Sequence, residues 1–301
     1  MSSVPGKRVL IAHLDDVGMC HGVNRAAHDL LGRGFVTCGS VMVPCPWFPE
    51  IAETAAARGD LDLGVHLTLT SEWRGYRWRP LTGVSRTTGL VDADGYMWRS
   101  VPELRARMDP LAVEEELRAQ IETARDSGLD PTHLDAHMGA ALVPELIETY
   151  VRLGEEYRLP ILLPRAIEAF LATLRLGGST PEHYAPWIAR LEGSQALFVD
   201  RLELAPAADA PDVAAELGRL VAGLSRGTTF LALHCSAPGD IELVAPERAE
   251  ARIAAWRACA DPALAELAVA EGIQLAGFRE LRERYLRSLE SDADDEAGPG
   301  P

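Results

Sequence analysis

Short apolar runs alternate with segments of helical periodicity along most of the 301 residues, and this alternation restricts the chain to few folds. About eight runs have the length and composition of buried strands. They cover residues 8–13, 36–43, 61–69, 132–135, 161–163, 197–202, 229–234 and 273–276. Helical patterns between them include residues 23–31, 49–58, 112–125, 144–157, 213–224, 247–258 and 279–289. Because strands joined by helices pair in parallel, the sequence predicts an α/β fold with mostly parallel strands, a distorted (β/α) barrel.

One domain over residues 1–290 accounts for this pattern, with an insertion loop at about residues 70–110. Loops of this length in a compact domain usually carry function. Five aromatic side chains of the loop lie among Arg and Gly: Trp73, Tyr76, Trp78, Tyr96 and Trp98. They suit either stacking on sugar rings or a separate small hydrophobic cluster, and the sequence leaves both readings open. The acidic, then Gly- and Pro-containing tail at residues 291–301 is expected to be disordered.

Charge and cysteine content exclude several classes of partner. The formal net charge of −16 disfavours nucleic acid and anionic membrane surfaces. No apolar run approaches the ~18 residues of a membrane span, and no signal peptide is expected at the N-terminus. Five cysteines without a CxxC pair indicate reduced thiols and a cytoplasmic protein. The oligomeric state stays open, a homo-oligomer included.

Ionisable side chains occur where several of the predicted strands end. The first strand is followed by Asp15 and Asp16, the third contains His66, and the strand at residues 229–234 ends in His234. The carboxyl ends of parallel strands meet at one face of an α/β fold, which is where active sites form. Taken singly, an Asp after a strand is often a helix N-cap, and a lone His in an apolar run is often a hydrogen-bonded core residue.

The fourth strand gives a more specific signal. His133, Asp135 and His137 alternate with apolar residues, so a strand would place all three on one face. Two imidazoles and a carboxylate on one face are unusual in a plain core. Whether His133 and Asp135 join the site is left open by the sequence.

Carboxylate and imidazole ligands together suit a divalent metal ion. Mg²⁺ and Zn²⁺ are the leading candidates, and Mn²⁺ or Co²⁺ would also be compatible. Three protein ligands leave positions open for a water molecule, whose pKa the metal would lower. A second carboxylate could then take the water's proton, and a histidine such as His234 could protonate a leaving amine.

Four segments resemble the YdjC-type carbohydrate deacetylases, the chitooligosaccharide deacetylase group related to polysaccharide deacetylases. HLDDVGMCHGVNRA resembles that family's ADDFG-x-x-x-GVN-R opening, LGVHLTLT its G-x-HLTL, PTHLDAHMG its THIDSH-x-H, and LALHCSAPGD its late histidine segment. The resemblance covers roughly residues 8–280. It implies a distorted (β/α) barrel and hydrolysis of N-acetyl groups on N-acetylglucosamine-containing oligosaccharides or glycolipids.

Carried over by position, the resemblance implies that Asp16, His66 and His137 bind the metal. It implies that Asp15 is the base that activates water and that His234 protonates or steadies the leaving amine. Arg165, in a Pro-x-x-x-Arg-like pattern, is implied to orient the acid or the substrate.

Three departures from the family pattern concern the substrate pocket. Leu-Asp-Asp-Val-Gly replaces Ala-Asp-Asp-Phe-Gly, Gly139 and Ala141 replace histidines, and Cys235 follows the late histidine in place of a proline. The leading hypothesis is therefore a metal-dependent hydrolase that removes N-acetyl groups from a small-molecule carbohydrate by attack of a metal-activated water. The alternatives are a metal-dependent hydrolase of an ester or phosphate bond and a catalytically silent carbohydrate-binding protein.

Overall fold

A sheet of parallel strands forms the centre of the protein, whose computed structural model describes residues 6–296 except 84, 175, 195, 197, 207–209 and 211. The sheet has seven strands in this part of the chain, in the order β4-β3-β2-β1-β6-β5, and β7 also pairs with β1. Every one of these pairs is parallel. The strands are β1 (Arg8–Val17), β2 (Cys38–Val41), β3 (Leu63–Leu67), β4 (Leu134–Ala136), β5 (Arg201–Leu204), β6 (Gly227–Leu233) and β7 (Ile273–Leu275).

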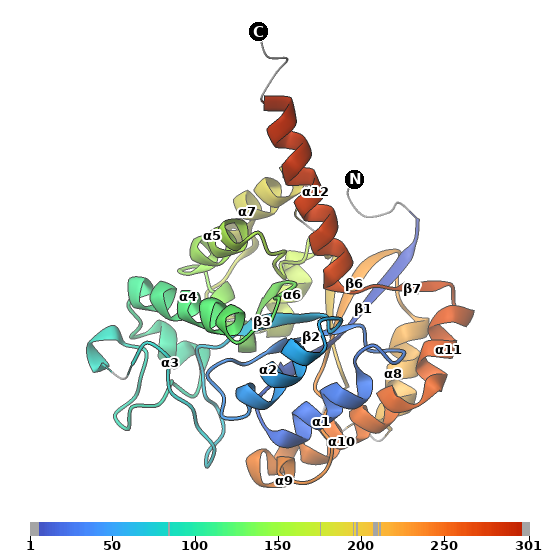
Figure 1. Cartoon of the computed structure of the whole chain (residues 1–301), viewed down its shortest axis with the longest axis horizontal. Helices are drawn as coiled ribbons and strands as arrows, with labels where there is room; N and C mark the ends of the chain where they lie inside the picture. The colour runs from blue at the N-terminus through green and yellow to red at the C-terminus, as the bar shows by residue number, and fades with distance from the viewer. Residues whose placement is uncertain are drawn as a thin grey trace.

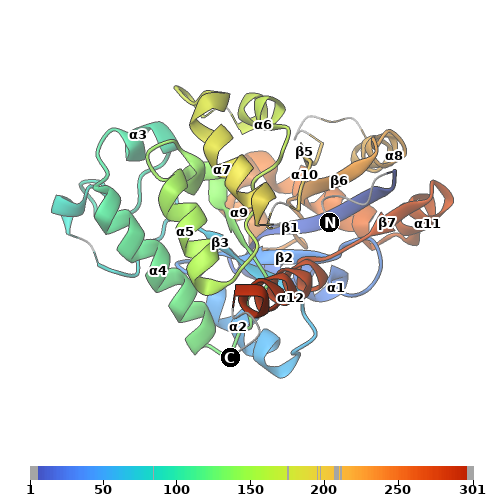
Figure 2. The ribbon, with the colours of Figure 1, turned by 90° about the horizontal axis from the view of Figure 1, so that it is seen from above.

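Helices surround this sheet, which curls into a half-barrel (Figure 1, Figure 2). They are α1 (His21–Leu30), α2 (Phe48–Ala57), α3 (Val101–Arg105), α4 (Pro110–Asp126), α5 (Ile147–Tyr157), α6 (Ile167–Leu174), α7 (Pro181–Gly193), α8 (Val213–Ala222), α9 (Ile241–Val244), α10 (Pro246–Ala260), α11 (Pro262–Ala270) and α12 (Phe278–Glu296). The prediction of a distorted α/β barrel with parallel strands is confirmed.

The central position of β1 follows from its sequence. Its residues Leu10, Ile11, Ala12 and Leu14 have no exposed surface, so both faces of the strand are covered. A strand that is apolar on both faces is typical of the middle of a parallel sheet. β1 pairs there with β2, β6 and β7, which brings segments from both ends of the chain together.

Two of the predicted strands differ from the structure. Residues 161–163 make only an isolated bridge, between Ile161 and Leu134. Pro160 and Pro164 flank this segment, and proline cannot donate a ladder hydrogen bond, so the segment is too short to continue as a strand. The strand predicted at residues 197–202 is displaced, because β5 covers Arg201–Leu204.

The insertion at residues 70–110 packs against the body of the protein. Trp73 and Trp78 are 8% and 2% exposed and belong to a hydrophobic cluster that also contains Met19 and Met97. The guanidinium of Arg79 lies 4.6 Å from the centre of the Tyr96 ring. The two tryptophans therefore belong to a separate hydrophobic cluster, as one of the two interpretations predicted. The other interpretation, in which all five rings stack on a ligand, does not fit their burial.

The C-terminal helix α12 projects from the body of the protein (Figure 1). It continues to Glu296, which is inside the range predicted to be a disordered tail. Residues 297–301 of that tail lie outside the described residues. Within the described ranges, we find no helix that is both long and apolar enough to cross a lipid bilayer.

Candidate active site

A pocket of about 740 Å³ opens at the carboxyl ends of the strands. This volume lies within the range of small-molecule binding sites. Six of the predicted or suspected site residues line it: Asp15, Asp16, His66, Asp135, His137 and His234. Segments far apart in the sequence thus deliver acids and imidazoles to one place, as expected for the active face of a parallel α/β fold.

The end of β1 has an irregular backbone that presents two consecutive carboxylates to the pocket. Side chains of successive strand residues normally point to opposite faces. Here the register with β2 shifts between Leu14 and Val17, and Asp16 has a positive φ of 65°. Such a conformation costs about 1–3 kcal/mol for a residue other than glycine and is often found at functional sites. α1 begins at His21 with Cys20 as its N-cap, so neither aspartate caps that helix.

Asp16, His66 and His137 converge on one point. Oδ1 of Asp16 lies 3.2 Å from Nδ1 of His137 and 3.6 Å from Nε2 of His66. All three ligand atoms lie within 4.8 Å of one another, and the three residues are buried. Among the described residues, no donor is aligned to make a hydrogen bond to Oδ1 of Asp16. A buried carboxylate oxygen without a donor costs free energy, and a cation held between these atoms would remove that cost.

The second nitrogen of each imidazole contacts a carboxylate. Nδ1 of His66 lies 2.9 Å from Oδ2 of Asp135, and Nε2 of His137 lies 3.0 Å from Oε2 of Glu72. A metal-binding histidine usually donates its other N–H in this way, which fixes the tautomer and orients the ring. The donor set therefore fits a divalent cation ligated by one carboxylate and two imidazoles.

The charges around this point favour an ionised Asp16. Burial opposes ionisation, but Arg252 and then His137 hold the pKa of Asp16 well below its usual value. Nη2 of Arg252 lies 2.6 Å from Oδ2 of Asp16. Burial also opposes a charged His137, yet Glu72 and Asp16 raise its pKa to about 10. The carboxylates of Glu72 and Asp16 thus favour a positive charge at the position of His137.

A second pair of ionisable groups lies beside the candidate metal ligands. Nε2 of His234 is 3.7 Å from Oδ2 of Asp15, just after the end of β6. Burial lowers the pKa of His234, which keeps the ring neutral near pH 7. A carboxylate and a neutral imidazole at this distance can exchange a proton through small movements of their side chains.

Arg165 is placed differently from the other predicted site residues. Its Nε donates to Oε1 of Glu192 at 2.7 Å, and its Nη1 contacts Asp200. Another arginine, Arg252 of α10, contacts the site directly through Asp16. Arg252 reaches the site from a helix predicted at residues 247–258, and no motif in the sequence distinguished it.

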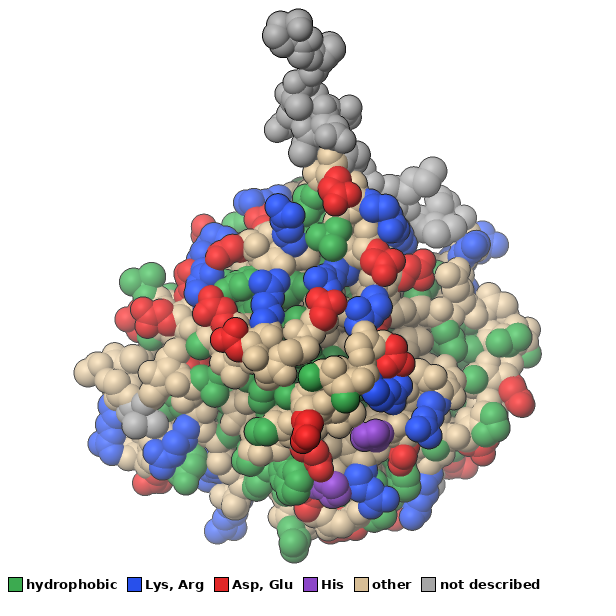
Figure 3. Space-filling model, viewed as in Figure 1, with side chains coloured by type: hydrophobic (Ala, Val, Ile, Leu, Met, Phe, Trp, Pro, Cys, Tyr) green, Lys and Arg blue, Asp and Glu red, His purple; other side chains and the backbone are tan. Residues whose placement is uncertain are grey.

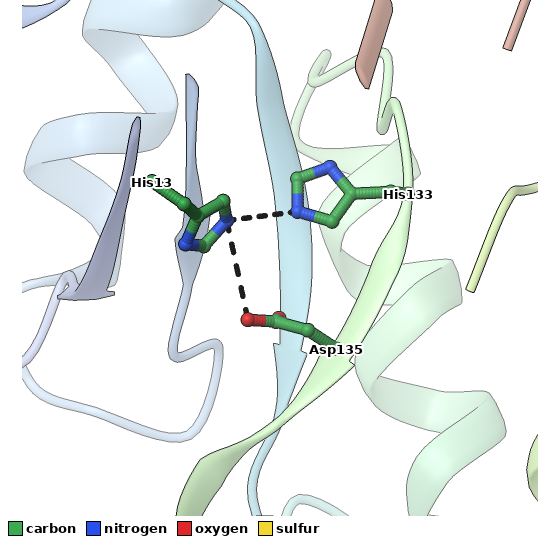
Figure 4. A group of neighbouring side chains, drawn as sticks. All are labelled: His13, His133 and Asp135. Atoms are coloured by element: carbon green, nitrogen blue, oxygen red, sulfur yellow. Dashed lines mark hydrogen bonds and ion pairs between the residues drawn. The ribbon is translucent and has the colours of Figure 1, made fainter. Parts of the chain in front are cut away.

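The side chains of His13, His133 and Asp135 point toward one another (Figure 4). Asp135 lines the pocket, whereas His13 of β1 and His133 have no exposed surface. Nε2 of His13 is 2.9 Å from Nε2 of His133 and 3.9 Å from Oδ2 of Asp135. Asp135 also accepts a hydrogen bond from the hydroxyl of Ser40 at 3.0 Å. Asp135 therefore joins the site through His66, and His133 joins it through His13.

Three side chains that contact the predicted site residues were not predicted from the sequence: the acidic Glu72, the basic Arg252 and the hydroxyl-bearing Ser40. Glu72 lies in the irregular insertion, where no periodicity indicates which way a side chain points.

On the face shown in Figure 3, basic and acidic side chains are interspersed, so this face has no continuous basic surface of the kind that binds a phosphate backbone.

A curled parallel sheet, with acids and imidazoles gathered in a pocket at the carboxyl ends of its strands, defines an α/β protein of the barrel type with an enzyme-like centre. The chain belongs to the family described as "YdjC-like protein", whose sequence model it matches over residues 9–270.

Several relatives of this family have names that describe an activity. A carbohydrate deacetylase of Thermus thermophilus is 43% identical over 186 residues, which span 62% of this chain and 62% of that protein. A chitooligosaccharide deacetylase of Yersinia enterocolitica is 28% identical over 164 residues, spanning 53% of this chain and 60% of that protein. The chain therefore covers less than two thirds of the length of both relatives.

A solved structure has the same fold. It is that of a protein from Enterococcus faecalis V583, described as a candidate cellobiose-phosphate cleavage protein. The TM-score is 0.72 at 23% sequence identity, and the alignment covers 92% of this chain and 99% of that chain. This similarity supports the distorted barrel and carries no information about the substrate.

Proposed function

We propose that this protein is a metal-dependent carbohydrate deacetylase that hydrolyses the N-acetyl group of an amino sugar or of an oligosaccharide containing N-acetylglucosamine. The observation that carries the proposal is the convergence of Asp16, His66 and His137, with one oxygen of Asp16 left without an aligned hydrogen-bond donor among the described residues. The names of the relatives in Thermus and Yersinia support the choice of an acetylated carbohydrate.

Asp16, His66 and His137 would hold the divalent cation, Mg²⁺ or Zn²⁺ first, with Mn²⁺ or Co²⁺ also compatible with the donor set. When bound, the cation would supply Lewis-acid polarisation of the acetyl carbonyl and increase the acidity of a nearby water. Glu72 and Asp135 would hold the two imidazoles in place.

Asp15 would accept a proton from the attacking water as the C–N bond is hydrolysed. Overall, amide hydrolysis moves one proton from water to the leaving nitrogen. Oδ2 of Asp15 lies 3.7 Å from Nε2 of His234, so this proton can reach the nitrogen through His234. Water therefore supplies one oxygen of the acetate and one hydrogen of the free amine, and its other proton is released when the acetic acid ionises.

Metal analysis combined with an acetate-release assay tests the proposal. The purified protein is loaded with each of the four metals in turn and incubated with N-acetylglucosamine and its short oligomers. We expect one equivalent of metal and release of acetate together with a free amine. If the protein binds a stoichiometric metal and hydrolyses an ester or a phosphate but releases no acetate, that bond replaces the N-acetyl amide as the bond it cleaves. Absence of both metal and turnover would favour a carbohydrate-binding protein.

A further inference from the structure

We propose that His13 is a positioning residue for Asp15. Held by His133, the His13 ring engages one carboxylate oxygen of Asp15, and the other oxygen is left to face the pocket. The inference rests on the proposed function only for the role of Asp15 as the base. The contacts themselves are features of the fold.

The two oxygens of Asp15 have different surroundings. Oδ1 lies 2.7 Å from Nδ1 of His13, which is a short contact between a carboxylate and an imidazole. Oδ2 lies 3.7 Å from Nε2 of His234, at the pocket. Hydrogen bonding to Oδ1 restricts rotation of the carboxylate, so Oδ2 is the oxygen available to a water molecule in the pocket.

The His13 ring is itself fixed by packing. It has no exposed surface, and its centre lies 4.6 Å from the ring of Phe230. His133 is equally buried and stacks on Phe278 of α12, with ring centres 3.9 Å apart. Rings packed in this way cannot turn without displacing their neighbours, so the orientation of His13 is set by the core.

Both nitrogens of His133 have a hydrogen-bond partner. The hydroxyl oxygen of Thr132 lies 3.0 Å from Nδ1 of His133 and 2.6 Å from Oδ1 of Asp62. Burial lowers the pKa of His133 well below its usual value, which keeps this ring neutral. Its Nε2 lies 2.9 Å from Nε2 of His13, so the two rings share one hydrogen bond.

One proton then lies between Nδ1 of His13 and Oδ1 of Asp15. The 2.7 Å contact would be repulsive if two lone pairs faced each other across it. The chain from Thr132 to Asp15 thus ends in a hydrogen bond that holds the carboxylate.

A second metal ion between His13, His133 and Asp135 fits the interatomic distances less well than a hydrogen bond between the two rings does. Two imidazole nitrogens on one tetrahedral Zn²⁺ with bonds of about 2.0–2.1 Å are about 3.3 Å apart. The two Nε2 atoms are 2.9 Å apart, the usual separation for an N–H···N hydrogen bond. Oδ2 of Asp135, in addition, already contacts Ser40 and His66.

Two variants at position 13 form a matched pair. His13→Leu fills the space with an apolar side chain and removes both hydrogen bonds. His13→Asn keeps an N–H donor close to the place of Nδ1 and loses the bond to His133. We expect His13→Leu to lower kcat on the order of 10²-fold. KM and the bound metal should stay within about twofold of wild type, because neither variant alters Asp16, His66 or His137. His13→Asn should recover most of the lost kcat.

Proton NMR with ¹⁵N-labelled histidine gives a readout that does not depend on turnover. We expect a low-field proton resonance coupled to Nδ1 of His13, which shifts in Asp15→Asn and is absent in both position-13 variants. If the wild type shows this resonance but releases no acetate, the proposed function fails and the positioning contact stands.

Three results would overturn the positioning role. One is wild-type kcat in folded His13→Leu. Another is an equal loss of kcat in His13→Leu and His13→Asn accompanied by loss of metal, which would indicate a structural role only. The last is a second metal equivalent in the wild type that disappears in His133→Gln, because His13 and His133 would then be metal ligands.

Discussion

Two groups of ionisable side chains, both of which contain imidazoles, lie side by side in this protein, and they differ in how their polar atoms are satisfied. The outer cluster is Asp16, His66 and His137, which line the pocket. The inner cluster is His13 and His133, which have no exposed surface. In the outer cluster, one carboxylate oxygen has no aligned donor among the described residues. In the inner cluster, each ring nitrogen has a partner at 3.0 Å or less.

This difference shows that the types of residue present do not by themselves define a metal site. Both clusters combine the ligands that divalent ions prefer, and strands β1 and β4 or their flanking residues contribute to both. An oxygen without an aligned donor does not separate them, because among the described residues Oδ1 of Asp135, beside the inner rings, lacks one as well. What separates them is that the outer ligands line the pocket, whereas both inner rings are closed off from solvent and have a partner on each nitrogen. By both measures the outer cluster is a candidate metal centre, and the inner cluster is a support for Asp15.

The largest expected effect comes from removing the charge in the outer cluster. Asp16→Asn should lose the bound metal and lower kcat/KM at least 10³-fold, because it removes the only anionic ligand of the proposed set. Metal content after dialysis and acetate release measure both effects. His133→Gln in the inner cluster is the matched control and should keep one metal equivalent. One equivalent of tightly bound metal in Asp16→Asn would remove the distinction between the clusters.

The clusters should also differ in how they respond to pH. A histidine ligand must be deprotonated before it can bind a metal. In the metal-free protein, burial lowers the pKa of His137, but Glu72 and Asp16 outweigh this effect and raise that pKa to about 10. Protons therefore compete with the metal below pH 10, and affinity should fall about tenfold for each unit by which the pH is lowered. The pKa of His133 is lowered instead, so its ring should release no proton.

Calorimetry measures this proton directly. Metal is titrated into metal-free protein at pH 8 in two buffers that differ in ionisation enthalpy. We expect release of at least about one proton per metal bound, because the pKa of His137 is raised to about 10 and Asp135 raises the pKa of His66 against the effect of burial. Glu72→Gln keeps the His137 ligand and removes the carboxylate that raises its pKa most, so it is the control for the origin of the proton and should release less than wild type. Equal heats in both buffers would contradict the assignment of His137 as a ligand with a raised pKa.

Much of the fold could be predicted from the sequence because local patterns determine it. The apolar runs of β1, β3 and β6 and the helical periodicity of α4 locate these elements within a few residues. The segment at residues 161–163 has the same apolar composition, yet two flanking prolines limit it to a single bridge. Composition predicts burial, whereas strand pairing also needs free backbone N–H groups.

The candidate site could be predicted only where its residues follow strands. Asp15, Asp16, His66 and His137 stand at strand ends or in the alternating run of β4, where topology fixes their position. Glu72 and Arg252 come from an irregular loop and from α10, and their direction depends on tertiary packing. The hydrogen bonds of His13 likewise depend on how β1 lies relative to the segment that leads into β4, which no local pattern reveals.

The smallest expected effect is that of removing Arg165, for which Arg252 at the site is the comparison. Arg165 pairs with Glu192 and Asp200, and its side chain is 29% exposed. Arg165→Ala should therefore leave kcat and metal content within about twofold of wild type and lower the free energy of unfolding by about 1 kcal/mol or less. Arg252→Ala leaves the buried Asp16 without its partner, and in the absence of metal it should cost about 3–5 kcal/mol.

Adding metal should return part of that loss in Arg252→Ala, because the cation supplies a new positive partner for Asp16. Thermal unfolding with and without metal measures the difference, and Arg165→Ala should show the same metal-induced shift as wild type. A 10²-fold loss of kcat in Arg165→Ala with metal retained would instead support the role implied for Arg165 by the family resemblance. The ion pairs with Glu192 and Asp200 would then have to open when substrate binds.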